Sequence, residues 1–508
     1  MIIPAPGLQP FQKNKVYKEE LLFTYNMIMK TPLCSSTKIL VLFLIYFGAF
    51  PSVYSQWSAP VNISPGAISA LLNESMGSCL GVSSDTVHVI WADRLSTNKG
   101  AIFYTRSADT GLTWSTPVAI TNLNGNAWNP AIAVNGKNVH VVWREIDTVT
   151  GHRTSMYEHS LDGGNTWGTS IVIDTVVADW PAVTVSGNTV YIANDIVTSS
   201  SPYNTEIFFL RSSDNGATWS THQQLTFSQG RSEDEAITSQ GPDVFMTWND
   251  NRNGPMQIFY KHSADHGLTW DTDVLINSEP SYGTMVSADG ANLDAPSAGT
   301  PSGHYQIHLN QSADTGSTWG ADMNLTNDPA NTYYYPYMVR DGSDLHMTYV
   351  KSGAGGQYLH SGDGGTTWDT PYSMGFSGIT PFIAYTGCIL HVILPDSGHI
   401  NYFRNPTGNA GPHCINTTGI SNIIKGGVKV TLYPNPFIYQ TTFEISTSEK
   451  RENTVVKIFN VFGQQIISSE FGLDNKLIIF RDNLKSGIYF YKVFQEEKEI
   501  STGKMLVE

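Results

Sequence analysis

The sequence predicts an all-β protein, a β-propeller followed by a small Ig-like β-sandwich. One short motif recurs six times at nearly constant spacing. Between its copies, strands of alternating apolar and polar residues recur in a fixed order, as expected for antiparallel sheets with buried faces. The chain of 508 residues holds 45 Gly, 12 Trp, 24 Tyr and 22 Phe but only 14% charged residues. This composition favours short strands joined by tight turns over helices.

The recurring motif is S-x-D-x-G-x-T-W, as in SADTGLTW at residues 107–114. Its aspartates lie 53, 52, 51, 49 and 49 residues apart and are Asp109, Asp162, Asp214, Asp265, Asp314 and Asp363. That period suits one four-stranded propeller blade. The motif ends at Trp114, Trp167, Trp219, Trp270, Trp319 and Trp368. We expect a structural role, in which Asp accepts backbone N–H groups, Gly adopts positive φ and Trp packs onto the blade.

The two ends of the repeat region predict how the ring closes. The segment 57–64 (WSAPVNIS) nearly repeats 114–121 (WSTPVAIT), which is the fourth strand of a blade. Residues 381–405 supply three strands with no motif after them. Together these pieces would make one composite blade, which removes the exposed edges of the ring. We therefore favour seven blades, although the irregular stretch 283–303 leaves six possible.

The chain divides into four predicted parts. Residues 1–55 form a signal peptide, because the apolar run Ile39–Phe50 follows two lysines and is too short for a membrane-spanning helix. Met27 or Met29 is an alternative start, since the first 26 residues do not resemble a signal. Residues 56–405 form the propeller, 406–427 a linker rich in Gly, Asn and Thr, and 428–508 the sandwich. We expect no permanent membrane span.

Charge and cysteine content exclude several function classes. The formal net charge of -15 argues against nucleic-acid binding, which needs clustered Lys and Arg. Cys79, Cys388 and Cys414 remain after the signal, and either a Cys388–Cys414 bridge or isolated buried thiols fit. Because motifs for phosphate or metal binding are missing, we expect no cofactor and no metal. Histidines at 88, 140, 346 and 391 share one strand position and belong to the blade pattern.

The repeated motif resembles the Asp box, or BNR repeat, of the sialidase (neuraminidase) superfamily. The resemblance covers about residues 57–405 and implies a propeller. It also implies, for active sialidases, an arginine triad, a Tyr nucleophile assisted by Glu, an Asp acid/base and an Arg-Ile-Pro motif in the first inner strand. The corresponding segment 77–82 (GSCLGV) has no Arg-Ile-Pro. The resemblance therefore transfers no catalytic residue to this chain.

The last 83 residues carry a second resemblance. The segments 430–437 (VTLYPNPF), 456–466 (VKIFNVFGQQI), 484–494 (LKSGIYFYKVF) and 502–507 (TGKMLV) resemble the C-terminal sorting domain of the type IX secretion system of Bacteroidetes. This implies interaction with the type IX machinery and export to the cell surface or medium.

A ligand site is expected on the face opposite the Asp boxes, where the longer loops lie. The residues that we select there are Arg94, Arg144, Arg231, Arg252, Asp93, Asp250, Trp128 and Trp180. The same loops also carry Glu145, Asp147, Asp179, Asp195, Glu233, Asp234, Glu235, Tyr282 and Tyr333–Tyr335. Such aromatic rings, carboxylates and guanidinium groups suit a glycan. Loop salt bridges, turn caps and plugs between blades would account for many of them equally well, and we expect the run 233–235 to be solvated.

The leading hypothesis is a glycan-recognising propeller, exported to the cell surface or medium, with or without glycosidase activity. Its enzyme form would be an exo-acting, sialidase-like hydrolase with an altered active site. The alternative is a non-catalytic scaffold or adhesion module whose mouth binds protein, because the fold alone does not determine function.

Overall fold

A computed structural model describes residues 57–406, apart from 74–75, 97, 175–178, 278, 301–302, 377–379 and 388, and the strands within 429–507. The predicted signal peptide, the linker, Cys388 and Cys414 lie outside the described residues. The chain separates into two compact units, Met1–Cys414 and Ile415–Glu508. Each unit is described by itself.

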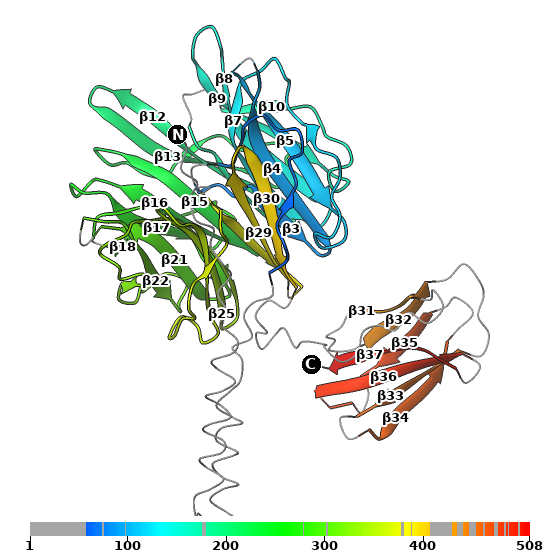
Figure 1. The fold of residues 1–508 in the computed structure, drawn as a ribbon. Coiled ribbons are helices and arrows are strands. Elements are labelled where there is room, and N and C mark those ends of the chain that lie inside the picture. The colour runs from blue at the N-terminus through cyan, green and yellow to red at the C-terminus, as the bar shows by residue number, and fades with distance from the viewer. Residues whose placement is uncertain are drawn as a thin grey trace, which may run out of the picture. The chain divides into compact units, whose positions relative to one another are not determined.

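The first unit is a propeller of seven antiparallel sheets (Figure 1). Blade 1 contains β2–β6 (Ala70–Leu71, Leu80–Ser83, Thr86–Arg94, Gly100–Ser107, Val118–Ala119), and blade 2 contains β7–β10 (Ala127–Asn135, Asn138–Ile146, Arg153–Ser160, Ile171–Asp174). Blade 3 contains β11–β14 (Ala182–Ser186, Thr189–Ser200, Tyr203–Ser212, Gln223–Gln224), and blade 4 contains β15–β18 (Ser232–Gln240, Asp243–Asp250, Gln257–Ser263, Val274–Asn277). Blades 5 and 6 contain β19–β23 (Ser281–Tyr282, Ser287–Asp289, Asn292–Gly299, Gln306–Ser312, Met323–Asn324) and β24–β27 (Tyr333–Asp341, Asp344–Lys351, Gly355–Ser361, Tyr372–Ser373). Blade 7 combines β28–β30 (Phe382–Thr386, Ile389–Asp396, His399–Asn405) with β1 (Val61–Asn62).

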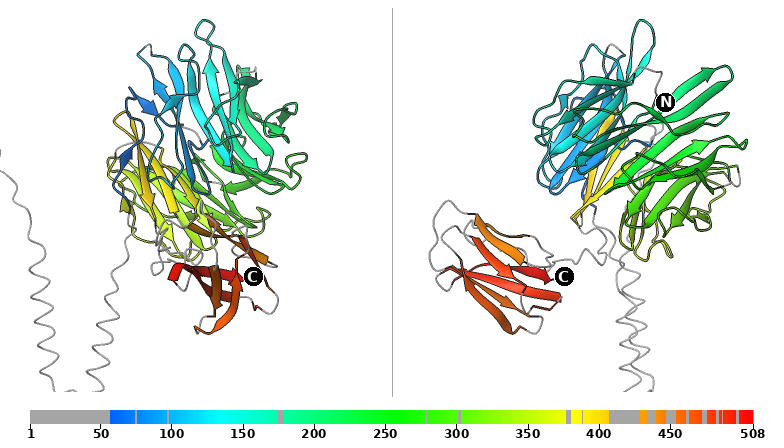
Figure 2. Two further views of the ribbon diagram at one scale, coloured as in Figure 1. Left: turned by 90° about the vertical axis from the view of Figure 1, so that its right-hand side faces the viewer. Right: turned by 180° about the vertical axis from the view of Figure 1, so that it is seen from behind.

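Blade 7 closes the ring as the sequence predicts. Strand β1 pairs antiparallel with β30, with Val61 opposite Tyr402. The N-terminal strands accordingly lie beside the last strands of the propeller in both views (Figures 1 and 2). Trp57, which precedes β1, packs edge-on against Tyr358 of blade 6 with 5.0 Å between ring centroids. It thus takes the place that an Asp-box tryptophan takes in the other blades.

Blade 5 accounts for the doubt between six and seven blades. Its inner edge is divided between β19 and β20, which pair with the two ends of β21. The irregular stretch in the sequence is therefore an interrupted inner strand, and the blade is a separate sheet in the ring. The count of seven is confirmed.

Each Asp box builds a turn between the third and fourth strands of its blade. In the first box, Asp109 Oδ1 accepts hydrogen bonds from the backbone N–H of Leu112 at 3.1 Å and of Thr113 at 2.8 Å. The Thr113 hydroxyl donates to Oδ2 at 2.6 Å. Led by the bonds from Thr113, these contacts lower the pKa of Asp109 to about 2. The carboxylates are thus engaged in holding their own turns.

The Asp boxes also join neighbouring blades. The tryptophans of the first five boxes pack edge-on against an aromatic ring in the third strand of the preceding blade, as Trp219 does against Tyr157 at 4.8 Å. The same ring covers the glycine of that box, because a Cβ on Gly216 would lie 1.8 Å from the Tyr157 hydroxyl. Edge-on aromatic pairs of this kind stabilise the interface beyond the area they bury. The motif therefore fixes the spacing between blades as well as the turn.

The four recurring second-strand histidines are buried and bonded within their own blades. Each Nδ1 lies 2.7–2.8 Å from a tyrosine hydroxyl of the adjacent third strand, in the pairs His88–Tyr104, His140–Tyr157, His346–Tyr358 and His391–Tyr402. Burial lowers the pKa of these imidazoles, to about 4 for His88. They are neutral structural groups at neutral pH.

The second unit is a sandwich of two sheets. One sheet contains β31 (Lys429–Tyr433), β32 (Gln440–Ser446) and β35 (Lys476–Phe480). The other contains β34 (Gln465–Glu470), β33 (Thr454–Phe459), β36 (Gly487–Gln495) and β37 (Lys498–Val507). Phe443 and Ile445 of the first sheet share one buried cluster with Val456, Ile458 and Val493 of the second. The unit thus has a hydrophobic core of its own.

Candidate functional site

Strand order separates the Asp boxes from the candidate site. The Asp-box turns lie at one end of the blades together with the turns between first and second strands. Loops that join second to third strands, and one blade to the next, lie at the opposite end. We call this opposite end the mouth. The carboxylates and arginines selected from the sequence lie at the mouth, and most of the acids gather in blades 3 and 4.

The start of the inner strand distinguishes blade 4 from the other blades. In blades 2, 4 and 6 this strand begins with a β-bulge and one residue at positive φ, namely Asn129, Asp234 and Tyr335. The next residue precedes the first regular pair of the strand. It is proline in four blades, at Pro130, Pro181, Pro336 and Pro381, but it is Glu235 in blade 4. A carboxylate thus occupies a position at which the blade pattern favours an apolar residue without an N–H group.

Glu235 and Asp195 are two deeply buried acids at the mouth. Glu235 is 0% exposed, and neither of its oxygens accepts a hydrogen bond from another described residue. Asp195, on β12, is 4% exposed and accepts a bond from the backbone N–H of Trp180 at 3.2 Å. Burial is the main reason why the pKa of each carboxyl group lies well above its usual range, and nearby acids add to it, led by Asp179 for Asp195 and by Asp195 for Glu235. Each group therefore keeps its proton to a higher pH than an exposed acid does.

Glu233 has a different environment two residues before Glu235. It is half-buried, and its Oε1 lies 3.3 Å from Arg231 Nη1. Burial raises the pKa of Glu233 to about 7, although Arg231 acts in the opposite direction. The pKa of Asp234 is also raised by burial, and this side chain accepts a bond from Asn249 at 2.9 Å. A carboxyl group with a pKa near 7 can both give and take a proton at neutral pH.

Two arginines bind another acid at the mouth, Asp179. Arg144 at the end of β8 binds one carboxylate oxygen, and Arg153 at the start of β9 binds the other. The Asp179 backbone N–H donates to the Asp195 carbonyl at 3.2 Å, which joins this ion pair to the buried acids. We call Asp179, Asp195, Glu233, Asp234 and Glu235 the carboxylate cluster.

Other buried polar atoms near the carboxylate cluster have no hydrogen-bond partner among the described residues. Asn194 takes the strand position that Trp143 and Trp248 hold in blades 2 and 4, and its Nδ2 is unpaired. Other unpaired atoms in these blades include Arg144 Nε, Thr205 Oγ1, Glu206 Oε2, Thr247 Oγ1 and Asn249 Oδ1. Buried polar groups are normally satisfied by protein, water or ligand. Their concentration in blades 2–4 distinguishes this part of the mouth.

The hairpin of β12 and β13 borders the carboxylate cluster. These strands, of 12 and 10 residues, are the longest of the described propeller strands (Figure 1). Thr205 near the start of β13 bridges to Arg231, and the Thr205 N–H donates to the Gly230 carbonyl at 3.4 Å. Tyr203 at the hairpin tip is 51% exposed, and burial together with Asp195, Asp179 and Glu233 raises the pKa of its phenol. This phenol is a hydrogen-bond donor at neutral pH.

The structure separates the residues selected from the sequence into two groups. Arg144 and Arg231 bind acids of the carboxylate cluster, and Trp180 adjoins it through its backbone. The others have local structural contacts. Asp93 accepts the N–H groups of Ile68 and Ser69, the Arg94 guanidinium lies 5.7 Å from the Trp128 ring centroid, and Arg252 pairs with both Asp250 and Asp273.

Sequence reasoning was wrong about the run 233–235, which we expected to be solvated. The bulge turns Glu235 inward, so that it is fully buried while Glu233 and Asp234 are half-buried. The residues selected from the sequence also do not include Arg153, Tyr203 and Glu206. The alignment of the blades holds one signal that could have identified the site, since Glu235 stands at a position where four of the other blades have proline.

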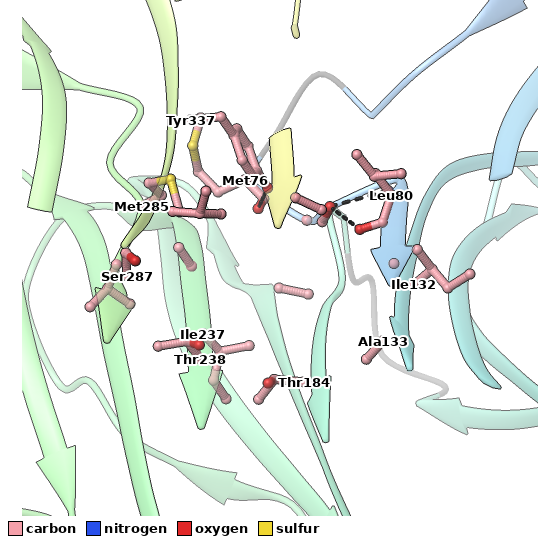
Figure 3. Close-up of a pocket in the computed structure, with 18 of the residues that line it drawn as sticks. Met76, Leu80, Ile132, Ala133, Thr184, Ile237, Thr238, Met285, Ser287 and Tyr337 are labelled. Atoms are coloured by element: carbon pink, nitrogen blue, oxygen red, sulfur yellow. Dashed lines mark hydrogen bonds between the residues drawn. The ribbon is translucent and has the colours of Figure 1, made fainter. Parts of the chain in front are cut away.

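A separate cavity of about 380 Å³ lies along the inner strands (Figure 3). Side chains such as Leu80, Ile132, Ile237 and Met285 line it, with hydroxyls from Thr184 and Thr238. Its one charged lining residue, Arg340, pairs with Asp294 at 2.6 Å. The cavity reaches Ala236, next to Glu235, but its lining offers no free acid or base. The candidate acid and base groups at the mouth are therefore those of the carboxylate cluster.

The pKa shifts predict how stability depends on pH. Because their pKa values are raised by burial, Asp195 and Glu235 release their protons at a higher pH in the folded protein than in the unfolded chain, which loses them near pH ~4. The free energy of unfolding should therefore fall as pH rises from 5 to 7.5, by up to about 1.4 kcal/mol per pH unit for each extra proton held. Urea denaturation at several pH values would measure this slope, and Glu235→Gln should reduce it. A slope of opposite sign would show that these acids are ionised in the folded state.

Comparisons with solved structures found several distant similarities. A Hadza microbial sialidase shares 16% identity with a TM-score of 0.43, over 57% of this chain and 66% of that one. The protein YCF48 bound to D1 peptide shares 16% identity with a TM-score of 0.45, over 69% and 97%. An α-L-arabinanase of Penicillium chrysogenum, complexed with arabinobiose, shares 14% with a TM-score of 0.41, over 55% and 92%. No curated protein matches the chain.

Two family models match the chain. The model of the secretion system C-terminal sorting domain matches residues 431–508, and proteins with this domain are exported by type IX secretion to the cell surface or beyond. None of the described residues forms a helix long and apolar enough to cross a membrane. The model of the BNR repeat-like domain matches residues 44–347, more than half of the chain. The chain belongs to the BNR repeat-like family and is an exported, sialidase-like β-propeller with a type IX sorting domain.

Proposed function

We propose that this protein is an exported glycan-binding propeller whose mouth, at blades 2–4, hydrolyses glycosides by acid–base chemistry. The observation that carries the proposal is the acidic bulge of blade 4. There the half-buried Glu233, with a pKa of about 7, lies near a buried and unpaired Glu235, in a position that is proline in four of the other six blades. A purely structural mouth would not need to replace proline with a carboxyl group that lacks a partner.

Glu233 is the proposed proton donor to the leaving oxygen of the glycoside. Its pKa lies near neutral pH, where a general acid is most effective, and its side chain is partly accessible. Asp195 and Glu235 are buried and are proposed as positioning residues that keep this corner of the mouth neutral. Arg144, Arg153 and the Tyr203 phenol are the proposed hydrogen-bond donors to glycan hydroxyl or carboxylate groups.

The test is a release assay on glycosides combined with a glycan array. The panel would contain aryl sialosides, arabinofuranosides, galactosides and glucosides. Hydrolysis of one class by the wild-type chain, lost in Glu233→Gln, would support the enzyme. Binding of one class without hydrolysis would support recognition alone and remove the catalytic assignment. Neither binding nor hydrolysis would overturn the proposal and favour the protein-binding scaffold predicted as the alternative.

A further inference from the structure

Blades 5 and 6 bring several tyrosine rings together at the mouth, outside the carboxylate cluster. Tyr282 belongs to β19, Tyr305 precedes β22, and Tyr334 and Tyr335 begin β24. Their ring centroids follow one another at 5.8 Å, 5.4 Å and 6.1 Å. Three separate segments of the chain thus contribute to one row of rings, which we call the tyrosine row.

The tyrosine row is accessible to a ligand. Tyr282 is 37% exposed, and Tyr305, Tyr334 and Tyr335 are half-buried. Tyr305 lies in the loop between the second and third strands of blade 5, and Tyr282 and Tyr334 lie near the starts of blades 5 and 6. All of these segments are at the mouth, as Glu233 is. Aromatic side chains that are partly exposed in a group mark interaction sites more often than single exposed rings do.

The backbone under the row adopts an unfavourable conformation. Tyr335 has a φ of 52°, in the left-handed region, at the bulge position where blades 2 and 4 carry Asn129 and Asp234. Asn and Asp tolerate this region better than a bulky aromatic residue does. The chain therefore keeps a tyrosine at a position where a smaller polar residue would be less strained, as is common at binding sites.

Polar groups and one ion pair lie beside Tyr333, the residue that precedes Tyr334 of the row. Asp328 accepts a hydrogen bond from the Tyr333 hydroxyl at 2.8 Å and lies 3.6 Å from Lys351 Nζ. These two charged side chains, which both contact Tyr333, thus pair with each other. The His304 ring also bonds the Thr332 hydroxyl at 3.0 Å. This combination of flat rings, hydroxyl groups and little net charge suits an uncharged, hydroxylated ring.

We infer that the tyrosine row is a second glycan-binding subsite, which takes successive neutral sugar rings of an oligosaccharide extending from the carboxylate cluster. The C–H faces of the sugars stack on the tyrosine rings, while the phenol groups bond their hydroxyls. This inference rests on the proposed function for the direction in which the oligosaccharide lies, because the proposed function places the reacting end of the glycan in blades 2–4. It predicts that affinity rises with the length of the oligosaccharide.

The experiment compares the full-length protein with Tyr282→Ala and Tyr334→Ala variants. Calorimetry with neutral disaccharides and hexasaccharides of xylan, arabinan, glucan and mannan would measure affinity. For the class that binds, each alanine variant should weaken hexasaccharide binding by about tenfold and change disaccharide binding little. Tyr334→Phe should keep most of the affinity, because it retains the ring. Tyr372→Ala is the matched control, since Tyr372 is 39% exposed on the outer strand β27 of blade 6.

The outcomes separate this inference from the proposed function. Hydrolysis of short glycosides with no effect of the tyrosine variants on hexasaccharide binding would overturn the subsite and leave the enzyme intact. Hexasaccharide binding that depends on the tyrosines, without any hydrolysis, would support the subsite and remove the catalytic assignment. Tyrosine-dependent binding of a proline-rich peptide, with no glycan bound, would overturn the subsite as a glycan site.

Discussion

Replacing Glu233 with glutamine should lower the turnover of a hydrolysed glycoside by about 10²–10⁴-fold, the range typical of losing a general acid. Glutamine keeps the size of the side chain and its place beside Arg231, but it has no proton to transfer. Burial raises the pKa of Glu233 to about 7, so the wild-type activity should decline as pH rises through about 7. Initial rates measured between pH 4 and pH 9 would give both the loss in the variant and the position of this decline.

Glu235→Gln provides the companion measurement for the same prediction. It removes a buried carboxyl group that acts through its neighbours, so it should shift the pH profile more than it lowers the maximal rate. It should also stabilise the protein slightly near pH 7.5, because an amide loses nothing by staying neutral. If Glu233→Gln retains wild-type turnover, Glu233 is not the acid. If Glu235→Gln lowers the rate equally at every pH, the positioning role is wrong.

The largest effect on stability is expected from an alanine at the glycine of an Asp box. Gly216 has a φ of 86°, and a Cβ there would lie 1.8 Å from the Tyr157 hydroxyl of the preceding blade. The change adds backbone strain of about 1–2 kcal/mol to an overpacking cost of about 1–3 kcal/mol. We therefore expect Gly216→Ala to lower the free energy of unfolding by about 3 kcal/mol, as measured by urea denaturation.

Gly187→Ala is the control for this prediction. Gly187 belongs to the same blade and has a φ of 59°, but nothing lies within 4 Å of the position of its Cβ. This variant carries the backbone strain alone, so the difference between the two isolates the contact between blades. Equal losses in the two variants would show that Tyr157 moves aside freely and that the blades are not held together by this contact.

Most of the fold could be predicted from the sequence because the six repeats can be aligned with one another. Six Asp boxes fix the strand order, and the likeness of residues 57–64 to 114–121 predicts a closure that the pairing of Val61 with Tyr402 confirms. Blade 5 was less certain, because the interruption between β19 and β20 removes the apolar run that marks an inner strand elsewhere.

The candidate site was only partly predictable. The strand order shows which loops share one end of the ring, and these loops contain Arg144, Arg231 and the acids. The sequence of each loop does not show which of these side chains contact one another. Asp250 and Arg252 satisfy each other within two residues, whereas Arg144 reaches Asp179 in the next blade. The bulge that buries Glu235 depends on the pairing of β15 with β16, and this register is not visible in the run of three acids itself.

The pairing of β1 with β30 also has a consequence for how the molecule is made. The bond between Ser58 and Arg404 joins residues at opposite ends of the propeller, so synthesis of nearly the whole ring precedes its completion. Contacts between such distant positions form slowly, because a long loop must close first. Until then blade 6 has no permanent neighbour on one side and the growing chain stays open. The last sheet of the propeller is therefore complete only when β1, the first propeller strand made, pairs with β30, the last one made.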